Sequence, residues 1–71
     1  MIDKGDIIRI KTREYVEFEG RPWYEHFVDA TKLLVVVRSE TNNGNMLATD
    51  SKGMLYHVHA NEVIEIKRKS T

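Results

Sequence analysis

Residues 33–37 read Leu-Leu-Val-Val-Val, which is the longest apolar run in the chain, and they predict a β-strand. The consecutive valines have stiff, β-branched side chains that fit a pleated strand better than a helix. Because the run is apolar on both faces, we expect this strand to be central in the sheet. The sequence Asn-Asn-Gly-Asn follows at residues 42–45, and Asn-Gly supplies the positive φ angles of a tight hairpin turn.

Three further strands are predicted after this turn. Residues 46–49 and 54–59 flank a second turn at residues 50–53, where Gly53 suits the left-handed position. Alternation within residues 54–59 puts Tyr56 and Val58 on one face and His57 and His59 on the other. Residues 59–62 are too few for an α-helix and predict a single 3₁₀ turn. A last strand is expected at residues 63–66.

The first strand is predicted on the other side of the apolar run, at residues 7–11. Ile8 and Ile10 share the face expected to meet the core, while Arg9 and Lys11 point to solvent. Five strands joined by tight turns, with one long early loop, predict an all-β domain that closes into a small five-stranded barrel. Closure removes the exposed sheet edges that an open meander would present. We expect one barrel domain over residues 1–66 and a flexible basic tail over residues 67–71.

Residues 12–31 form the long loop and allow two interpretations. A hairpin is favoured, because residues 15–18 alternate apolar with acidic side chains, residues 20–22 suit a turn, and residues 23–28 can return. The alternative is a short helix that begins at Pro22, since proline suits the first helical position. Apolar residues recur at helical spacing from Trp23 onward, so both interpretations stay open.

Composition limits the function classes that the chain can belong to. It has no cysteine, which excludes disulfides and thiolate metal sites and fits a reducing compartment, so we expect a cytoplasmic protein. The first eleven residues lack the apolar segment of a signal peptide. Net charge is zero, but residues 14–30 carry five acids and one base, which is −4, and the remainder carries +4. This balance argues against a dedicated nucleic-acid binder, because such domains are usually clearly basic.

Neither catalysis nor metal binding is expected from the motifs present. The chain has no nucleophile elbow, no phosphate-binding glycine loop and no deep cleft expected for shifting a carboxylate pKa, so we predict a non-enzymatic protein without a cofactor. His57 and His59 share a strand face and, with His26, could provide three zinc ligands. Because nothing in the sequence brings His26 near this pair, a solvent-facing histidine pair is the preferred interpretation.

Five of the six aromatic residues lie between residues 15 and 27, interleaved with acids. Exposed tryptophan and tyrosine are favoured at interfaces, and surrounding carboxylates would attract a basic protein surface. The alternative is that these rings close one end of the core. The predicted protein-binding residues are Glu17, Glu19, Trp23, Tyr24 and Glu25.

A second candidate surface is basic. If the first and last strands are neighbours, their cations would form a patch able to contact phosphates, with Tyr56 or His57 stacking on a base. The alternative is an ordinary solvated charged face. The predicted nucleic-acid-binding residues are Arg9, Lys11, Lys67, Arg68 and Lys69.

The order of these elements resembles SH3-like and KOW-type barrels. Residues 4–10 (Lys-Gly-Asp-Ile-Ile-Arg-Ile) are similar to their opening strand, and residues 53–66 are similar to their closing strand, 3₁₀ turn and last strand. Short barrels of this kind occur in bacterial and bacteriophage genomes. Members bind peptides, RNA, DNA, ribosomes or RNA polymerase, so the resemblance implies a small accessory protein that docks on a larger machine. It does not identify the partner.

Overall fold

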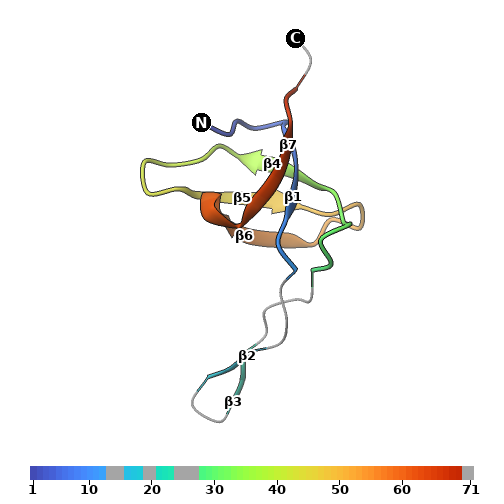
Figure 1. The fold of residues 1–71 in the computed structure, drawn as a ribbon, viewed down its shortest axis with the longest axis vertical. Coiled ribbons are helices and arrows are strands. Elements are labelled where there is room, and N and C mark those ends of the chain that lie inside the picture. The colour runs from blue at the N-terminus through green and yellow to red at the C-terminus, as the bar shows by residue number, and fades with distance from the viewer. Residues whose placement is uncertain (13–15, 19–20, 24–27, 70–71) are drawn as a thin grey trace.

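The computed structural model describes residues 1–12, 16–18, 21–23 and 28–69. These residues form a five-stranded sheet, a separate two-stranded hairpin and one 3₁₀ turn (Figure 1). In chain order the elements are β1 (Ile7–Ile10), β2 (Val16–Phe18), β3 (Arg21–Trp23), β4 (Leu34–Arg38), β5 (Asn45–Thr49), β6 (Leu55–His59), η1 (Ala60–Glu62) and β7 (Val63–Lys67).

The sheet confirms the five predicted strands and the predicted 3₁₀ turn. Its strand order is β6-β5-β4-β1-β7, with every neighbouring pair antiparallel, so the apolar strand β4 is central as expected. Strands β4, β5 and β6 form a meander, whereas β1 joins β4 to the last strand of the chain. In the part of the chain that the structure describes, no helix is long and apolar enough to cross a membrane.

The core lies on the inner face of this bent sheet. Figure 1 shows the β1–β7 pair running across the direction of β5 and β6, so the two halves of the sheet enclose the core between them. Alternation confirms the predicted faces: Ile8 and Ile10 are buried on β1, and Tyr56 and Val58 on β6. The buried apolar cluster comprises Ile2, Ile8, Ile10, Val28, Leu34, Val36, Met46, Ala48, Tyr56 and Val58.

The predicted hairpin in the long loop is present, with a different turn. Strands β2 and β3 pair antiparallel, and Phe18 lies opposite Arg21. The return strand therefore begins at Arg21, rather than after a turn at residues 20–22. Pro22 is part of β3, where an edge strand tolerates the missing N–H group. The helix alternative is wrong at Pro22 and Trp23, which are strand residues, while residues 24–27 lie outside the described residues.

Both glycine turns adopt the predicted backbone conformation. Gly44 and Gly53 each have a φ of +83°, a region that side chains with a Cβ atom rarely occupy. In the first turn Gly44 donates its backbone N–H to the carbonyl of Thr41, and Thr41 donates to the carbonyl of Asn45. In the second, the Asp50 carboxylate accepts the backbone N–H groups of Lys52 and Met54.

The two glycines are expected to differ in their tolerance of alanine. Gly53→Ala meets no atom within 4 Å and should cost only the left-handed strain, about 1–2 kcal/mol. At Gly44 the new Cβ atom would lie 2.9 Å from His59 Nε2, which is itself 2.9 Å from the Asn43 carbonyl oxygen. We expect Gly44→Ala to lose roughly 1–3 kcal/mol more in urea unfolding. Equal losses for the two variants would show that the His59 ring moves aside freely.

The last strand extends into the segment predicted to be a basic tail. Lys67 is the last residue of β7, opposite Ile7 of β1. The two following residues still contact the domain, since Arg68 and Lys69 both bond to Asp6. The register with β1 extends the ordered strand by one residue past the expected boundary at residue 66, while residues 70–71 lie outside the described part.

Candidate functional site

The face of the sheet turned away from the core is apolar along β4. Val35 and Val37 expose 42% and 36% of their surface, whereas Leu34 and Val36, which alternate with them, are buried. Leu33, just before the strand, is 56% exposed, and Leu55 on β6 is 57% exposed. With two half-buried neighbours these side chains form a patch that we call the outer apolar face: Ile7, Leu33, Val35, Val37, Leu47 and Leu55.

Strand register aligns part of this face into a row that crosses the sheet. Val35 lies opposite Ile7 on one side and opposite Thr49 on the other, and Thr49 lies opposite Leu55. Residues that face each other in a pleated sheet project to the same side, so the row is continuous from β1 to β6. Lys67 extends it on β7, opposite Ile7, and ends it with a positive charge.

The apolar run at residues 33–37 is buried on one side only, the side of Leu34 and Val36. The central position of β4 covers its edges with neighbouring strands, and covering its second face would require another layer. None of the described elements forms one. Contiguous exposed apolar patches on soluble proteins commonly mark interaction sites.

The predicted protein-binding residues fall on or near the β2–β3 hairpin. Glu17 lies in β2, opposite Pro22, and Trp23 lies in β3, opposite Val16. Glu19, Tyr24 and Glu25 lie outside the described residues. In Figure 1 the hairpin projects away from the five-stranded sheet, beyond the lower end of β1. The Ala30 backbone N–H bonds to Thr12 Oγ1 at 3.1 Å, which ties the two arms of the loop where they leave the sheet.

The predicted basic patch is divided by ion pairs. Strands β1 and β7 are neighbours, as expected, but their register puts Glu65 opposite Arg9, and Arg9 Nη2 lies 2.6 Å from Glu65 Oε2. Arg68 reaches to the other side of the strand, where its Nη1 donates to Asp6 Oδ2 at 3.1 Å and to the Met1 carbonyl at 2.8 Å. Both arginines are thus partly neutralised.

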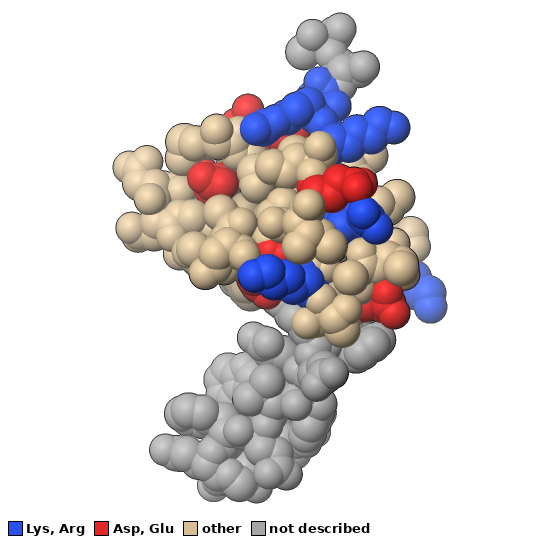
Figure 2. All heavy atoms as spheres, viewed as in Figure 1, with Lys and Arg blue, Asp and Glu red and all other residues tan. Residues whose placement is uncertain are grey.

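Three lysines of the basic set remain exposed: Lys11, Lys67 and Lys69. Lys67 lies on the outer side of β7, whereas the stem of Lys69 lies against Gly5, whose added Cβ atom would be 2.7 Å from Lys69 Cδ. Figure 2 shows cations gathered near the C-terminal end of the chain, and mixed with acids over the rest of the visible face. Two of the five predicted cations, Arg9 and Arg68, are thus paired with carboxylates.

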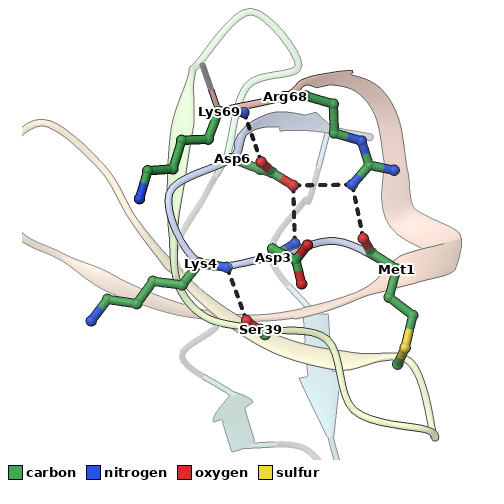
Figure 3. A network of polar contacts seen from close by, with 7 residues as sticks. All are labelled: Met1, Asp3, Lys4, Asp6, Ser39, Arg68 and Lys69. Carbon is green, nitrogen blue, oxygen red and sulfur yellow. Dashed lines mark hydrogen bonds and ion pairs between the residues drawn. The ribbon is translucent and has the colours of Figure 1, made fainter. Parts of the chain in front are cut away.

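Asp6 connects the two ends of the domain (Figure 3). Its buried carboxylate accepts the backbone N–H groups of Asp3 at 3.0 Å and Lys69 at 2.8 Å, together with the Arg68 guanidinium. The Asp3 amide chiefly, then the Lys69 amide and Arg68, hold the Asp6 pKa below its usual value. Gly5 allows this turn, with a φ of +98°. The Lys-Gly-Asp sequence therefore has a structural role.

A second carboxylate organises the turn between β5 and β6. Asp50 accepts backbone bonds and the Tyr56 hydroxyl at 3.0 Å, and Lys32 Nζ lies 3.6 Å from it. The hydrogen bond from the Met54 amide is the main cause of a lowered Asp50 pKa, and burial is the main cause of a raised Tyr56 pKa. Because Tyr56 is buried in the core, the expectation that it stacks on a base is wrong.

The two histidines of β6 differ in their surroundings. His57 is exposed on the outer side of the sheet. His59 Nδ1 accepts the backbone N–H of Asn61 at 3.1 Å, and its Nε2 lies 2.9 Å from the Asn43 carbonyl oxygen, so the neutral ring with hydrogen on Nε2 satisfies both bonds. Glu62 completes the cap by accepting the His59 N–H. His26 lies outside the described residues, within which no cluster of potential metal ligands occurs.

Sequence reasoning proposed two candidate surfaces and did not identify the outer apolar face. The signal for the outer apolar face was present in the run at residues 33–37, because a strand can bury only half of its side chains unless layers cover both of its faces.

Comparisons of the chain with models of protein families, with curated proteins and with solved structures find no match.

Proposed function

We propose that this protein is a non-enzymatic protein-interaction module that docks on a larger assembly through its outer apolar face. The observation that carries the proposal is the exposed apolar row across the sheet, in which Val35 and Leu55 remain accessible on either side of Thr49. Burying such a surface against a partner is favourable, because apolar surface that is removed from water contributes to the free energy of binding.

The hairpin is the second element of the proposed contact. Leu33 of the outer apolar face directly precedes β4, in the segment of chain that follows the hairpin, so one partner could contact both. In this proposal Trp23 and Tyr24 anchor the partner, while Glu17, Glu19 and Glu25 steer a basic surface toward the segment that carries −4. The partner surface is therefore apolar with a basic margin.

An SH3-like barrel is the proposed fold family. Support comes from the strand order, in which the first strand lies between the meander and the last strand, and from the 3₁₀ turn that precedes the last strand. The resemblance of residues 4–10 and 53–66 to KOW-type barrels points the same way. A cytoplasmic accessory protein of bacterial or bacteriophage type is the role that this family suggests.

Weak nucleic-acid binding is the second candidate function. The exposure of Lys11, Lys67 and Lys69 favours it, and the pairing of Arg9 with Glu65 weakens it. Phosphate contacts of this kind predict an affinity for labelled DNA or RNA that falls steeply with added salt. An anisotropy titration that is insensitive to salt would contradict this second candidate.

The protein-docking proposal can be tested without a known partner. Peptides selected against the immobilised protein from a random phage-displayed library should include binders of the outer apolar face. We expect Val35→Lys to weaken these binders tenfold or more, which corresponds to about 1.4 kcal/mol. Met54→Lys is the matched control, because Met54 is also 42% exposed but lies outside this face. Equal effects of the two variants, or no effect of Val35→Lys on any binder, would overturn the proposed surface.

A further inference from the structure

Strand β7 forms one edge of the sheet. It pairs with β1 on one side, and among the described residues no strand lies on its other side. Edge strands present unpaired backbone N–H and C=O groups to which a further strand can be added. β7 is five residues long, and its residues 64–67 alternate apolar with charged side chains, so it offers both backbone groups and side-chain contacts.

A groove of about 530 Å³ runs beside this edge. Two apolar residues of β7 that line it are exposed, Ile64 at 49% and Ile66 at 39%. Ile66 lies opposite the buried Ile8, so it belongs to the inner face of the sheet but is left uncovered at the edge. The N-terminus contributes another exposed apolar side chain, Met1, to the same groove. The edge is thus apolar on its inner side.

We propose that β7 pairs antiparallel with β7 of a second copy of this chain, around a two-fold axis at Ile66. In a continuous sheet, paired residues project to the same side, so only registers that match outer with outer side chains are allowed. Centring the pair on Ile66 places the two Ile66 side chains together over the groove. It also places Glu65 of each copy opposite Lys67 of the other.

The charges on β7 favour this register over the one centred on Glu65. Centring the strands on Glu65 would put the two Glu65 carboxylates face to face, which is unfavourable for residues directly opposite in a sheet. In the proposed register each Glu65 contacts Arg9 of its own chain, at 2.6 Å, and Lys67 of the second copy. On the outer side of the junction, each negative side chain then lies opposite a positive side chain of the other copy. A two-fold interface requires this kind of self-complementarity.

The pairing would join two five-stranded sheets into one continuous sheet. Because the two-fold axis is perpendicular to the sheet, both outer apolar faces would lie on the same side of the dimer. The inference does not depend on the proposed docking function, since it uses the edge of the sheet and the docking proposal uses its outer face. Failure of either one leaves the other unaffected.

Sedimentation velocity on the full chain tests the pairing. The wild-type mass should rise with protein concentration from 8.3 kDa toward twice that value. Lys67→Glu places like charges opposite each other across the junction and is expected to weaken the dimer at least tenfold. Lys52→Glu makes the same charge change on the exposed turn between β5 and β6 and should leave the dimerisation constant unchanged.

A charge exchange distinguishes this register from other modes of association. Glu65→Lys alone should also weaken self-association, and circular dichroism checks that each variant stays folded. An equimolar mixture of Lys67→Glu and Glu65→Lys chains restores an opposite-charge pair at every contact, so the mixture should dimerise while neither variant does so alone. The proposal would be overturned if the wild type were a monomer at all concentrations, or if Lys67→Glu left dimerisation unchanged. It would also be overturned if the mixture of the two variants did not dimerise.

Discussion

Leu34→Ala is expected to lower the free energy of unfolding by about 2–5 kcal/mol. Leu34 is fully buried in the central strand and packs within the apolar cluster, so alanine leaves a cavity that neighbouring strands cannot fill. A domain of this size has a total stability of only about 4–10 kcal/mol. Urea denaturation should therefore give the variant an unfolding midpoint at a much lower urea concentration than that of the wild type.

Leu33→Ala is the matched control for this loss. The same substitution one residue earlier removes a side chain that is mostly exposed, so stability should change by about 0.5 kcal/mol or less. If Leu33→Ala instead destabilised the protein as much as Leu34→Ala, a layer would have to cover the outer apolar face in solution. That result would contradict the docking surface as well as the assignment of the two faces.

Asp6→Asn is expected to produce the second large loss of stability. The amide removes the charge that faces Arg68, and its NH₂ group meets donors where the carboxylate accepted the backbone N–H groups of Asp3 and Lys69. The urea midpoint should fall several times further than for Asp3→Asn, because Asp3 contributes only backbone groups to this network. Comparable shifts for the two variants would show that the carboxylate does not hold the termini together.

The same carboxylate predicts a pH dependence with a defined sign. The folded Asp6 pKa is lowered from 3.8, so the stabilisation is fully present above that value and is lost as pH falls through the folded pKa. Wild-type stability should decrease below about pH 4. Asp6→Asn should show a shallower decrease, with the remainder due to Asp29 and Asp50, whose pKa values are also lowered. An unchanged acid profile in the variant would contradict this assignment.

Local patterns were sufficient to predict most of the secondary structure. Alternation in β1 identified Ile8 as a core residue, and the glycine turns at Gly44 and Gly53 followed from turn chemistry. Alternation in β6 grouped Tyr56 with Val58 but did not show which face of the strand is buried, so Tyr56 was suggested to stack on a base. The hairpin turn was less predictable, because Pro22 is compatible with a turn, a helix start and an edge strand.

Long-range pairing was beyond what the sequence could provide. Arg9 was assigned to a basic patch because the sequence does not show that Glu65 lies beside it. Only the register of β1 with β7 places these two residues opposite each other. Asp6 was noted only as part of a motif, since its contacts come from residues at the other end of the chain. The exposure of Val35 depends on the absence of a covering layer among the described elements, which is a tertiary property.

The most direct test of the docking proposal is a map of amide chemical-shift changes when a selected peptide binds the isotopically labelled protein. The proposal predicts that the largest changes in the sheet fall on Leu33, Val35 and Leu55, with smaller changes along β7 and in the turn at residues 50–53. Changes concentrated on β7 or on Lys11, Lys67 and Lys69, with β4 unaffected, would contradict the outer apolar face as the docking surface.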